Sequence, residues 1–163
     1  MSTFVSIGTS ALPFGRFFLE LDRLAPKLPC PVVVQHGHTP FAFNHCIAMP
    51  FVDRDTFDRY LVTSRLVITH GGATVLQAIR SGRTPVVIPR SPAYGEIIDD
   101  HQIEFARALA SAGRVFTAYE PAELERVIDR ALAVPIGARA ADNSRMVALI
   151  ASSLYRYAQE HRR

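Results

Sequence analysis

The 163-residue sequence has few cysteines, no long apolar run and no strong excess of either charge. Its two cysteines, Cys30 and Cys46, lack Cys-x-x-Cys spacing and are too few for a disulfide framework. We therefore expect both to be reduced, partly buried thiols. No apolar stretch approaches the roughly 18 residues that span a bilayer, and the N-terminus has no signal-peptide pattern. These absences predict a complete cytosolic polypeptide without a membrane anchor of its own.

The charge balance excludes one class of partner. The formal net charge is +3 at pH 7, and the isoelectric point is about 9.2. This mild excess suits an acidic ligand or a membrane surface, but it is too weak to indicate nucleic-acid binding. The length and the hydrophobic content of 48% suit one globular domain, residues 1–163, with a core at about 4–134.

The stretch from residue 66 to residue 89 organises the rest of the chain. Short β-branched runs at 66–69 and 86–88 bracket a helical segment at 74–81. Gly71-Gly72 opens that segment and Gly82 closes it. A strand, a glycine turn, a helix and a second strand predict a right-handed βαβ unit with two parallel strands.

The same alternation of strand and helix recurs about six times along the chain. Strands are expected at 4–7, 32–35, 47–49, 66–69, 86–88 and 115–117, and helices at about 16–27, 57–61, 74–81, 99–113, 121–132 and 141–159. This order predicts an α/β fold, a Rossmann-like doubly wound sheet of about six parallel strands. The loops that bind anions should then gather at one edge of the sheet.

The turn after residue 69 is a candidate anion site. His70, Gly71 and Gly72 end the strand, and Ala73 and Thr74 begin the helix. A helix start presents unpaired N–H groups and a positive dipole end, and glycine lets an anion approach the backbone. The pattern therefore indicates a phosphate-bearing ligand. Glycine turns of this kind also serve only close helix–strand packing in many doubly wound domains, and both interpretations stand on this local evidence.

Several segments carry a family resemblance, and they occur in the family's order over most of residues 4–117. They are Gly8-Thr9, Gln35-His36-Gly37, the strand and loop 67–73, the segment 82–90, and Tyr94-Gly95-Glu96 followed by Asp99-Asp100-His101-Gln102. The sequence resembles the C-terminal, nucleotide-sugar-binding half of GT-B glycosyltransferases of family 28. It is most similar to small stand-alone versions of that half. These are the donor-binding subunits of bacterial exopolysaccharide glycosyltransferases and of the two-part N-acetylglucosaminyltransferase of dolichol-linked glycan assembly.

The resemblance implies a UDP-sugar donor site without a further cofactor. The donor diphosphate would bind at Gly71, Gly72, Ala73 and Thr74, with Gly8 and Thr9 forming a second loop at the cleft. Further donor contacts are implied for Phe51 (uracil, through the backbone), Glu96, and Asp100 and Gln102 (sugar hydroxyls). Phe51 also suits a core position, and Asp100 and Gln102 also suit helix capping.

Three histidines and Gln77 need separate consideration. His70 is the one candidate catalytic residue, and the alternative is a hydrogen-bonded structural residue, which is common for a histidine at a strand end. His36 and His38 have no third ligand at metal spacing, so we expect no metal site. The family often has an acidic residue for the nucleotide ribose where this chain has Gln77, and a neutral amide is the weaker acceptor.

The predicted function is the donor-binding and catalytic subunit of an inverting UDP-sugar-dependent hexosyltransferase. Its acceptor would be a lipid-linked saccharide in exopolysaccharide or glycan biosynthesis. No general base stands out, and the resemblance implies that the base would come from a membrane-associated acceptor-binding partner subunit. That partner would hold this chain at the cytoplasmic face of the membrane. The alternative is a non-catalytic nucleotide-sugar-binding or regulatory module. A Rossmann-type dehydrogenase is disfavoured because the Gly-x-Gly-x-x-Gly turn is missing.

Overall fold

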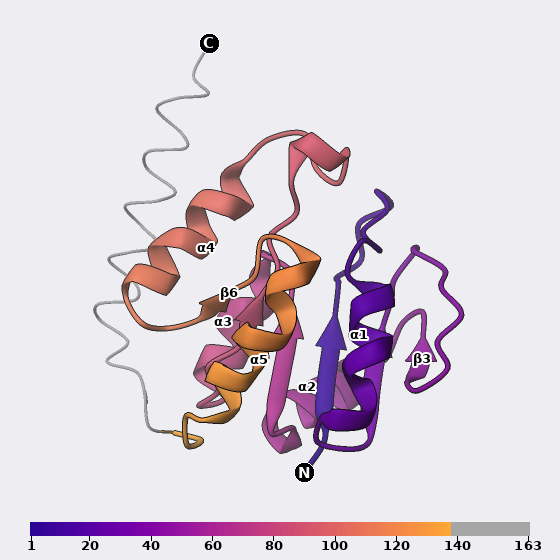
Figure 1. The fold of residues 1–163 in the computed structure, drawn as a ribbon, viewed down its shortest axis with the longest axis vertical. Coiled ribbons are helices and arrows are strands. Elements are labelled where there is room, and N and C mark those ends of the chain that lie inside the picture. The colour runs from indigo at the N-terminus through magenta and orange to yellow at the C-terminus, as the bar shows by residue number, and fades with distance from the viewer. Residues whose placement is uncertain (138–163) are drawn as a thin grey trace.

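The computed structural model describes residues 1–137, which form a six-stranded parallel sheet in the order β3-β2-β1-β4-β5-β6 (Figure 1). The strands are β1 (Thr3–Ser6), β2 (Val32–Gln35), β3 (Ile47–Met49), β4 (Leu66–Thr69), β5 (Val86–Val87) and β6 (Phe116–Thr117). This is the predicted Rossmann-like doubly wound sheet, and each strand end lies within one residue of its expected position. The helix expected at 141–159 lies outside the described residues.

Residues 1–137 also form five α-helices and three short 3₁₀ segments, of which η3 and α5 follow the last strand. The helices are α1 (Phe18–Leu24), α2 (Arg54–Thr63), α3 (Ala73–Arg80), α4 (His101–Ser111) and α5 (Leu124–Leu132), and the 3₁₀ segments are η1 (Ala25–Lys27), η2 (Pro92–Tyr94) and η3 (Pro121–Glu123). Gly82 ends α3 with a φ of +75°, where its N–H donates to Ile79 O and the N–H of Arg83 donates to Ala78 O. No helix of residues 1–137 is both long and apolar enough to cross a bilayer.

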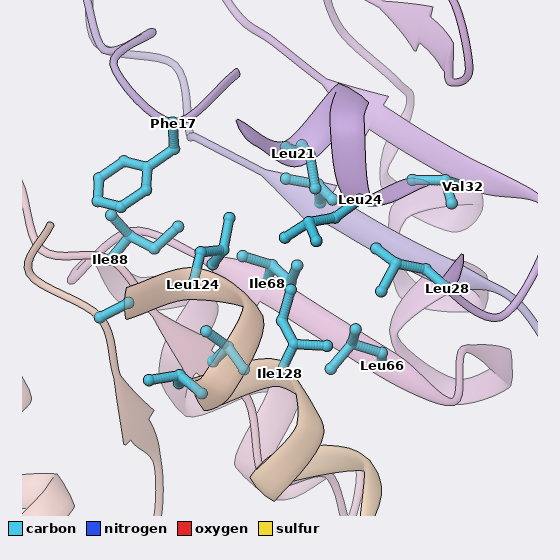
Figure 2. Close-up of a cluster of buried hydrophobic side chains, with 14 of the residues drawn as sticks. Phe17, Leu21, Leu24, Leu28, Val32, Leu66, Ile68, Ile88, Leu124 and Ile128 are labelled. Atoms are coloured by element: carbon cyan, nitrogen blue, oxygen red, sulfur yellow. The ribbon is translucent and has the colours of Figure 1, made fainter. Parts of the chain in front are cut away.

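Alternation along the strands assigns side chains to the two faces of the sheet. One face packs under α1 and α5: Leu21 and Leu24 meet Leu66 and Ile68 of β4 and Leu124 of α5 in one buried cluster (Figure 2). The neighbouring strand residues Phe4, Val33 and Val67 point to the other face and pack with Leu61 of α2 and Ala78 of α3. Both faces are covered at β1, β2 and β4, which are buried along their whole length, whereas the edge strand β3 is largely exposed.

The cysteines agree with the sequence in part. Cys46 is half-buried, whereas Cys30 is exposed in the turn between Pro29 and Pro31 that leads into β2. Both are free thiols. The expectation of partial burial is therefore wrong for Cys30, because two flanking prolines hold its turn outside the sheet.

Candidate functional site

The candidate site lies where β1 and β4 run side by side in the middle of the sheet. Ser6 pairs with Thr69 at the last position of both strands. After β1 the chain continues to α1 on one face, and after β4 it continues to α3 on the other face. The two connections diverge at the carboxyl ends, which point upward in Figure 1. Ligands of doubly wound sheets bind at such a point.

An open cleft of about 430 Å³ occupies this position. It is lined by Ser6, Gly8, Thr9, Gln35, Val52, Arg54, Phe57, His70, Ala73 and Thr74. These residues come from the ends of β1, β2 and β4 and from the starts of α2 and α3. The structure thus brings together the loop after β1 and the loop after β4, whose strand ends Ser6 and Thr69 are 63 residues apart in the sequence.

The ring of His70 fills the space between the two glycine loops. A β-carbon placed on Gly8 would lie 2.6 Å from His70 Cε1, and one placed on Gly72 would lie 2.4 Å from His70 Nε2. Gly8 also has a φ of +80°, which favours glycine for a second reason. Both glycines are therefore required by the imidazole, whatever ligand binds beside them.

His70 is neutral at physiological pH. Burial, together with the positive charge of Arg90, lowers the pKa of His70 from 6.5 to about 4. Its Nδ1 lies 3.5 Å from Thr69 Oγ1. A neutral imidazole can exchange hydrogen bonds with a ligand, but it supplies no positive charge to a phosphate.

The start of α3 offers backbone donors to the cleft. Gly72 is the N-cap residue, and no side chain caps the helix. The first amides of a helix have no acceptor within it. The N–H of Gly71 already donates to Gln102 Oε1, at 3.2 Å. The donors left for an anion are therefore those of Gly72, Ala73 and Thr74.

Gln102 joins two loops from behind the cleft. Its side chain is buried, and Oε1 accepts from the backbone N–H of both Gly71 and Arg90, the latter at 3.1 Å. Two N–H donors on one atom identify that atom as the oxygen and fix the orientation of the amide. Only the NH₂ group of Gln102 is then left for a ligand, so toward a sugar hydroxyl it acts as a donor.

Glu96 lies in a buried ion pair. Its Oε1 accepts from Arg16 Nε at 2.8 Å, and its Oε2 accepts from the N–H of Ser91 at 2.9 Å. Arg16 also donates to the carbonyls of Pro89 and Tyr119. Both carboxylate oxygens of Glu96 thus have protein partners, and the residue does not line the cleft.

The remaining predicted residues surround the cleft without lining it. Phe51 is 46% exposed with its ring 5.1 Å from that of His38, and its neighbour Val52 lines the cleft. Gln77 is partly exposed, one turn after Ala73 on the same side of α3. Asp100 is the exposed N-cap residue of α4, and its carboxylate makes no capping hydrogen bond.

Sequence reasoning missed the wall of the cleft that α2 provides. Arg54 and Phe57 line it, yet the sequence marked this helix only by its apolar residues. It also passed over the Asp-x-Asp spacing of Asp53 and Asp55 on either side of Arg54. Asp53 is the N-cap residue of α2 and accepts from the N–H of Thr56 at 2.9 Å. Residues 1–137 hold no cluster of three or more His, Cys, Asp or Glu side chains suited to a metal.

Comparison with known proteins agrees with this architecture. The model of the glycosyltransferase family 28 C-terminal domain matches residues 7–154. No curated protein matches the sequence. One similar solved structure is the glycotransferase of kitacinnamycin, with a TM-score of 0.64 and 18% sequence identity over 93% of this chain. Another is CalG4, the calicheamicin glycosyltransferase, with a TM-score of 0.61 and 22% identity over 97% of this chain.

This chain corresponds to a part of those glycosyltransferases. It covers 39% of the first chain and 41% of the second. At these identities the likeness shows the fold alone, the Rossmann-like domain with its parallel sheet.

Proposed function

The chain belongs to the glycosyltransferase family 28 C-terminal domains, and from that premise we propose that it binds the UDP-sugar donor of a hexosyltransferase. The observation that carries the proposal is the cleft at the carboxyl ends of β1 and β4, with the uncapped start of α3 on its wall. Backbone N–H groups at a glycine-opened helix start are suited to a diphosphate. In this proposal the amides of Gly72, Ala73 and Thr74 bind it.

The nucleoside and the sugar would occupy the two sides of this diphosphate position. Val52 and Phe57 supply an apolar wall at the start of α2, next to Phe51, for the base. Gln77 follows Ala73 by one turn and would meet the ribose. Asp100 and the NH₂ group of Gln102 would bind sugar hydroxyls, the carboxylate as acceptor and the amide as donor.

The chemical contribution of this chain would be stabilisation of the leaving group. In an inverting transfer the acceptor oxygen bonds to the anomeric carbon as the bond to the diphosphate breaks, and negative charge develops on the departing phosphate. Helix amides aimed at that charge lower the barrier. The described residues that line the cleft, all within 1–137, include no Asp or Glu, and the pKa of His70 is about 4. His70 is thus a weak base, suited to orienting a hydroxyl or phosphate oxygen.

We further propose that a second polypeptide supplies the acceptor site and the general base. The chain covers about two fifths of the similar glycosyltransferases, so the residues that face the cleft from the other half would come from elsewhere. The proposed partner is a membrane-associated glycosyltransferase subunit that holds this chain at the cytoplasmic face, with a lipid-linked saccharide as the acceptor. A non-catalytic nucleotide-sugar-binding module is the alternative, since His70 is the only base that residues 1–137 place on the cleft and it is a weak one.

Two measurements test the proposal. Calorimetry with UDP, with and without EDTA, should give the same saturable binding in both, and NAD should not bind. Transfer from a radiolabelled UDP-sugar to membrane lipid should require the partner. Absence of UDP binding would reject the donor site. Robust turnover by the chain alone, within an order of magnitude of the pair, would reject the two-subunit arrangement, and no turnover with any partner would favour the non-catalytic module.

A further inference from the structure

Among residues 1–137, Arg54 is the only residue lining the cleft that carries a charge at neutral pH. Of the cleft-lining residues only Arg54 and His70 are titratable, and His70 is neutral with a pKa of about 4. A nucleoside diphosphate brings negative charge into this space. The helix amides supply partial charges only, so the guanidinium of Arg54 is the one full positive charge that residues 1–137 place on the wall of the cleft.

The position of Arg54 is not explained by the stability of its own helix. It is the first residue of α2, directly after the N-cap residue Asp53. A cation in the first turn opposes the helix dipole, and carboxylates such as Asp55 are the favourable residues there. Residues that run against local preference are expected where function requires them.

The ion pair that Arg54 makes is weak enough to be exchanged for a ligand. Its Nε lies 3.1 Å from Asp58 Oδ2, and the two side chains are 79% and 48% exposed. Exposed pairs at this spacing contribute little to stability. The terminal nitrogens of Arg54 have no acceptor among residues 1–137. They can therefore form the paired hydrogen bonds that guanidinium groups make with phosphate oxygens.

We propose that Arg54 binds the diphosphate of the nucleotide, acting from α2 while the amides at the start of α3 act from the other helix. This inference rests on the proposed function. Arg54 would release Asp58 when the nucleotide enters, so that Asp58 competes with the ligand. The contact adds affinity for the charged part of the donor and leaves the nucleoside part unaffected.

The experiment compares uridine, UMP and UDP by calorimetry for the wild type and three variants. Arg54→Gln should weaken UDP about tenfold and change uridine less than twofold, with UMP between them. Asp58→Asn should tighten UDP two- to threefold, because the competing carboxylate is gone. Arg59→Gln is the matched control: it removes the same charge from the same helix, at an exposed position that does not line the cleft. It should leave all three affinities within twofold.

The outcomes separate this inference from the proposed function. If the wild type binds UDP and Arg54→Gln binds it equally well, the role of Arg54 is refuted while the donor site stands. If Arg54→Gln weakens uridine as much as UDP, Arg54 contacts the nucleoside and the inference is wrong. If Arg59→Gln weakens UDP as much as Arg54→Gln, the effect is one of net charge and the inference is also wrong. A wild type that binds no UDP overturns both proposals.

Discussion

Substitution of Gly72 separates two reasons why this position is glycine. The first is the imidazole of His70, which leaves no space for a side chain. The second is the diphosphate, which in the proposed function approaches the backbone at the same residue. Gly72 has a φ of −99°, a value that alanine adopts without strain, so Gly72→Ala tests space alone.

The structure sets the size of the first effect. The new methyl carbon would lie 2.4 Å from His70 Nε2 and 3.0 and 3.1 Å from Cε1 and Cδ2. This is about 1 Å inside the ordinary 3.5–4.0 Å separation of non-bonded atoms. The ring has little room to turn away, because a β-carbon on Gly8 would also lie within 3 Å of it. We expect Gly72→Ala to lower the free energy of unfolding by about 1–3 kcal/mol, the usual cost of overpacking.

The double variant His70→Ala/Gly72→Ala isolates the second effect. Without the ring the methyl group has room, so the cost of Gly72→Ala in the His70→Ala background should fall to near zero by urea denaturation. UDP binding should behave differently. The methyl group still stands between the phosphate and the amides of α3, and losing one or two charge-assisted hydrogen bonds costs about 1.5–3 kcal/mol each. We expect at least tenfold weaker UDP binding by the double variant than by His70→Ala.

The stability and the UDP affinity of the double variant decide between the two reasons. If the second substitution restores stability and leaves UDP affinity equal to that of His70→Ala, then Gly72 serves only the packing of the imidazole. The diphosphate would have to bind elsewhere. If stability is not restored, the overlap with the ring is not the cause of the loss.

Three further predictions concern the residues around the diphosphate position. Measured by calorimetry, Gln77→Ala should weaken UDP binding by about 1 kcal/mol, the usual net value of one neutral hydrogen bond, and Gln77→Glu should strengthen UDP binding. Unchanged affinity in both variants would show that Gln77 does not contact the ribose. Gln102→Met keeps the side-chain volume but removes the acceptor for the N–H groups of Gly71 and Arg90, so amide hydrogen exchange at those two groups should accelerate. Unchanged protection would show that Oε1 of Gln102 does not hold the two loops together. His70 stays neutral in the folded protein down to about pH 4, but in the unfolded chain it takes up a proton below pH 6.5. As the pH falls from 6.5 to 4, the wild type should therefore lose up to about 3 kcal/mol of its free energy of unfolding. Urea denaturation across that range should show this loss in the wild type and not in His70→Asn.

The sequence predicts the sheet well because its signals are local. Each strand is a short apolar run, and glycine or proline marks most element ends, as at Gly82 and Pro121. Parallel strands then place all the loops that follow them at one edge, which is why Gly8 and Gly72 could be expected near each other. The one helix predicted after residue 134 lies outside the described residues.

The roles of individual side chains were harder to predict because they depend on distant partners. Glu96 stands in a sequence motif that suggests donor binding, but its ion pair is with Arg16, 80 residues away. Nothing near Gln102 in the sequence indicates that its oxygen holds Gly71 and Arg90. Arg54 was missed because a charged residue at a helix start has no periodicity to mark it, and only the tertiary structure places it on the cleft.

Arg90 adds a buried positive charge near the candidate site. Arg90 is 2% exposed and donates to the backbone carbonyls of Ile7, Leu12 and Glu96. The nearby carboxylate of Glu96 pairs with Arg16, so Arg16, Arg90 and Glu96 together carry a net charge of +1. Arginine does not lose its proton at any ordinary pH, and buried charges are screened little by salt. We therefore expect the positive charge that Arg90 adds at this sheet edge to be less sensitive to ionic strength than that of the exposed Arg54.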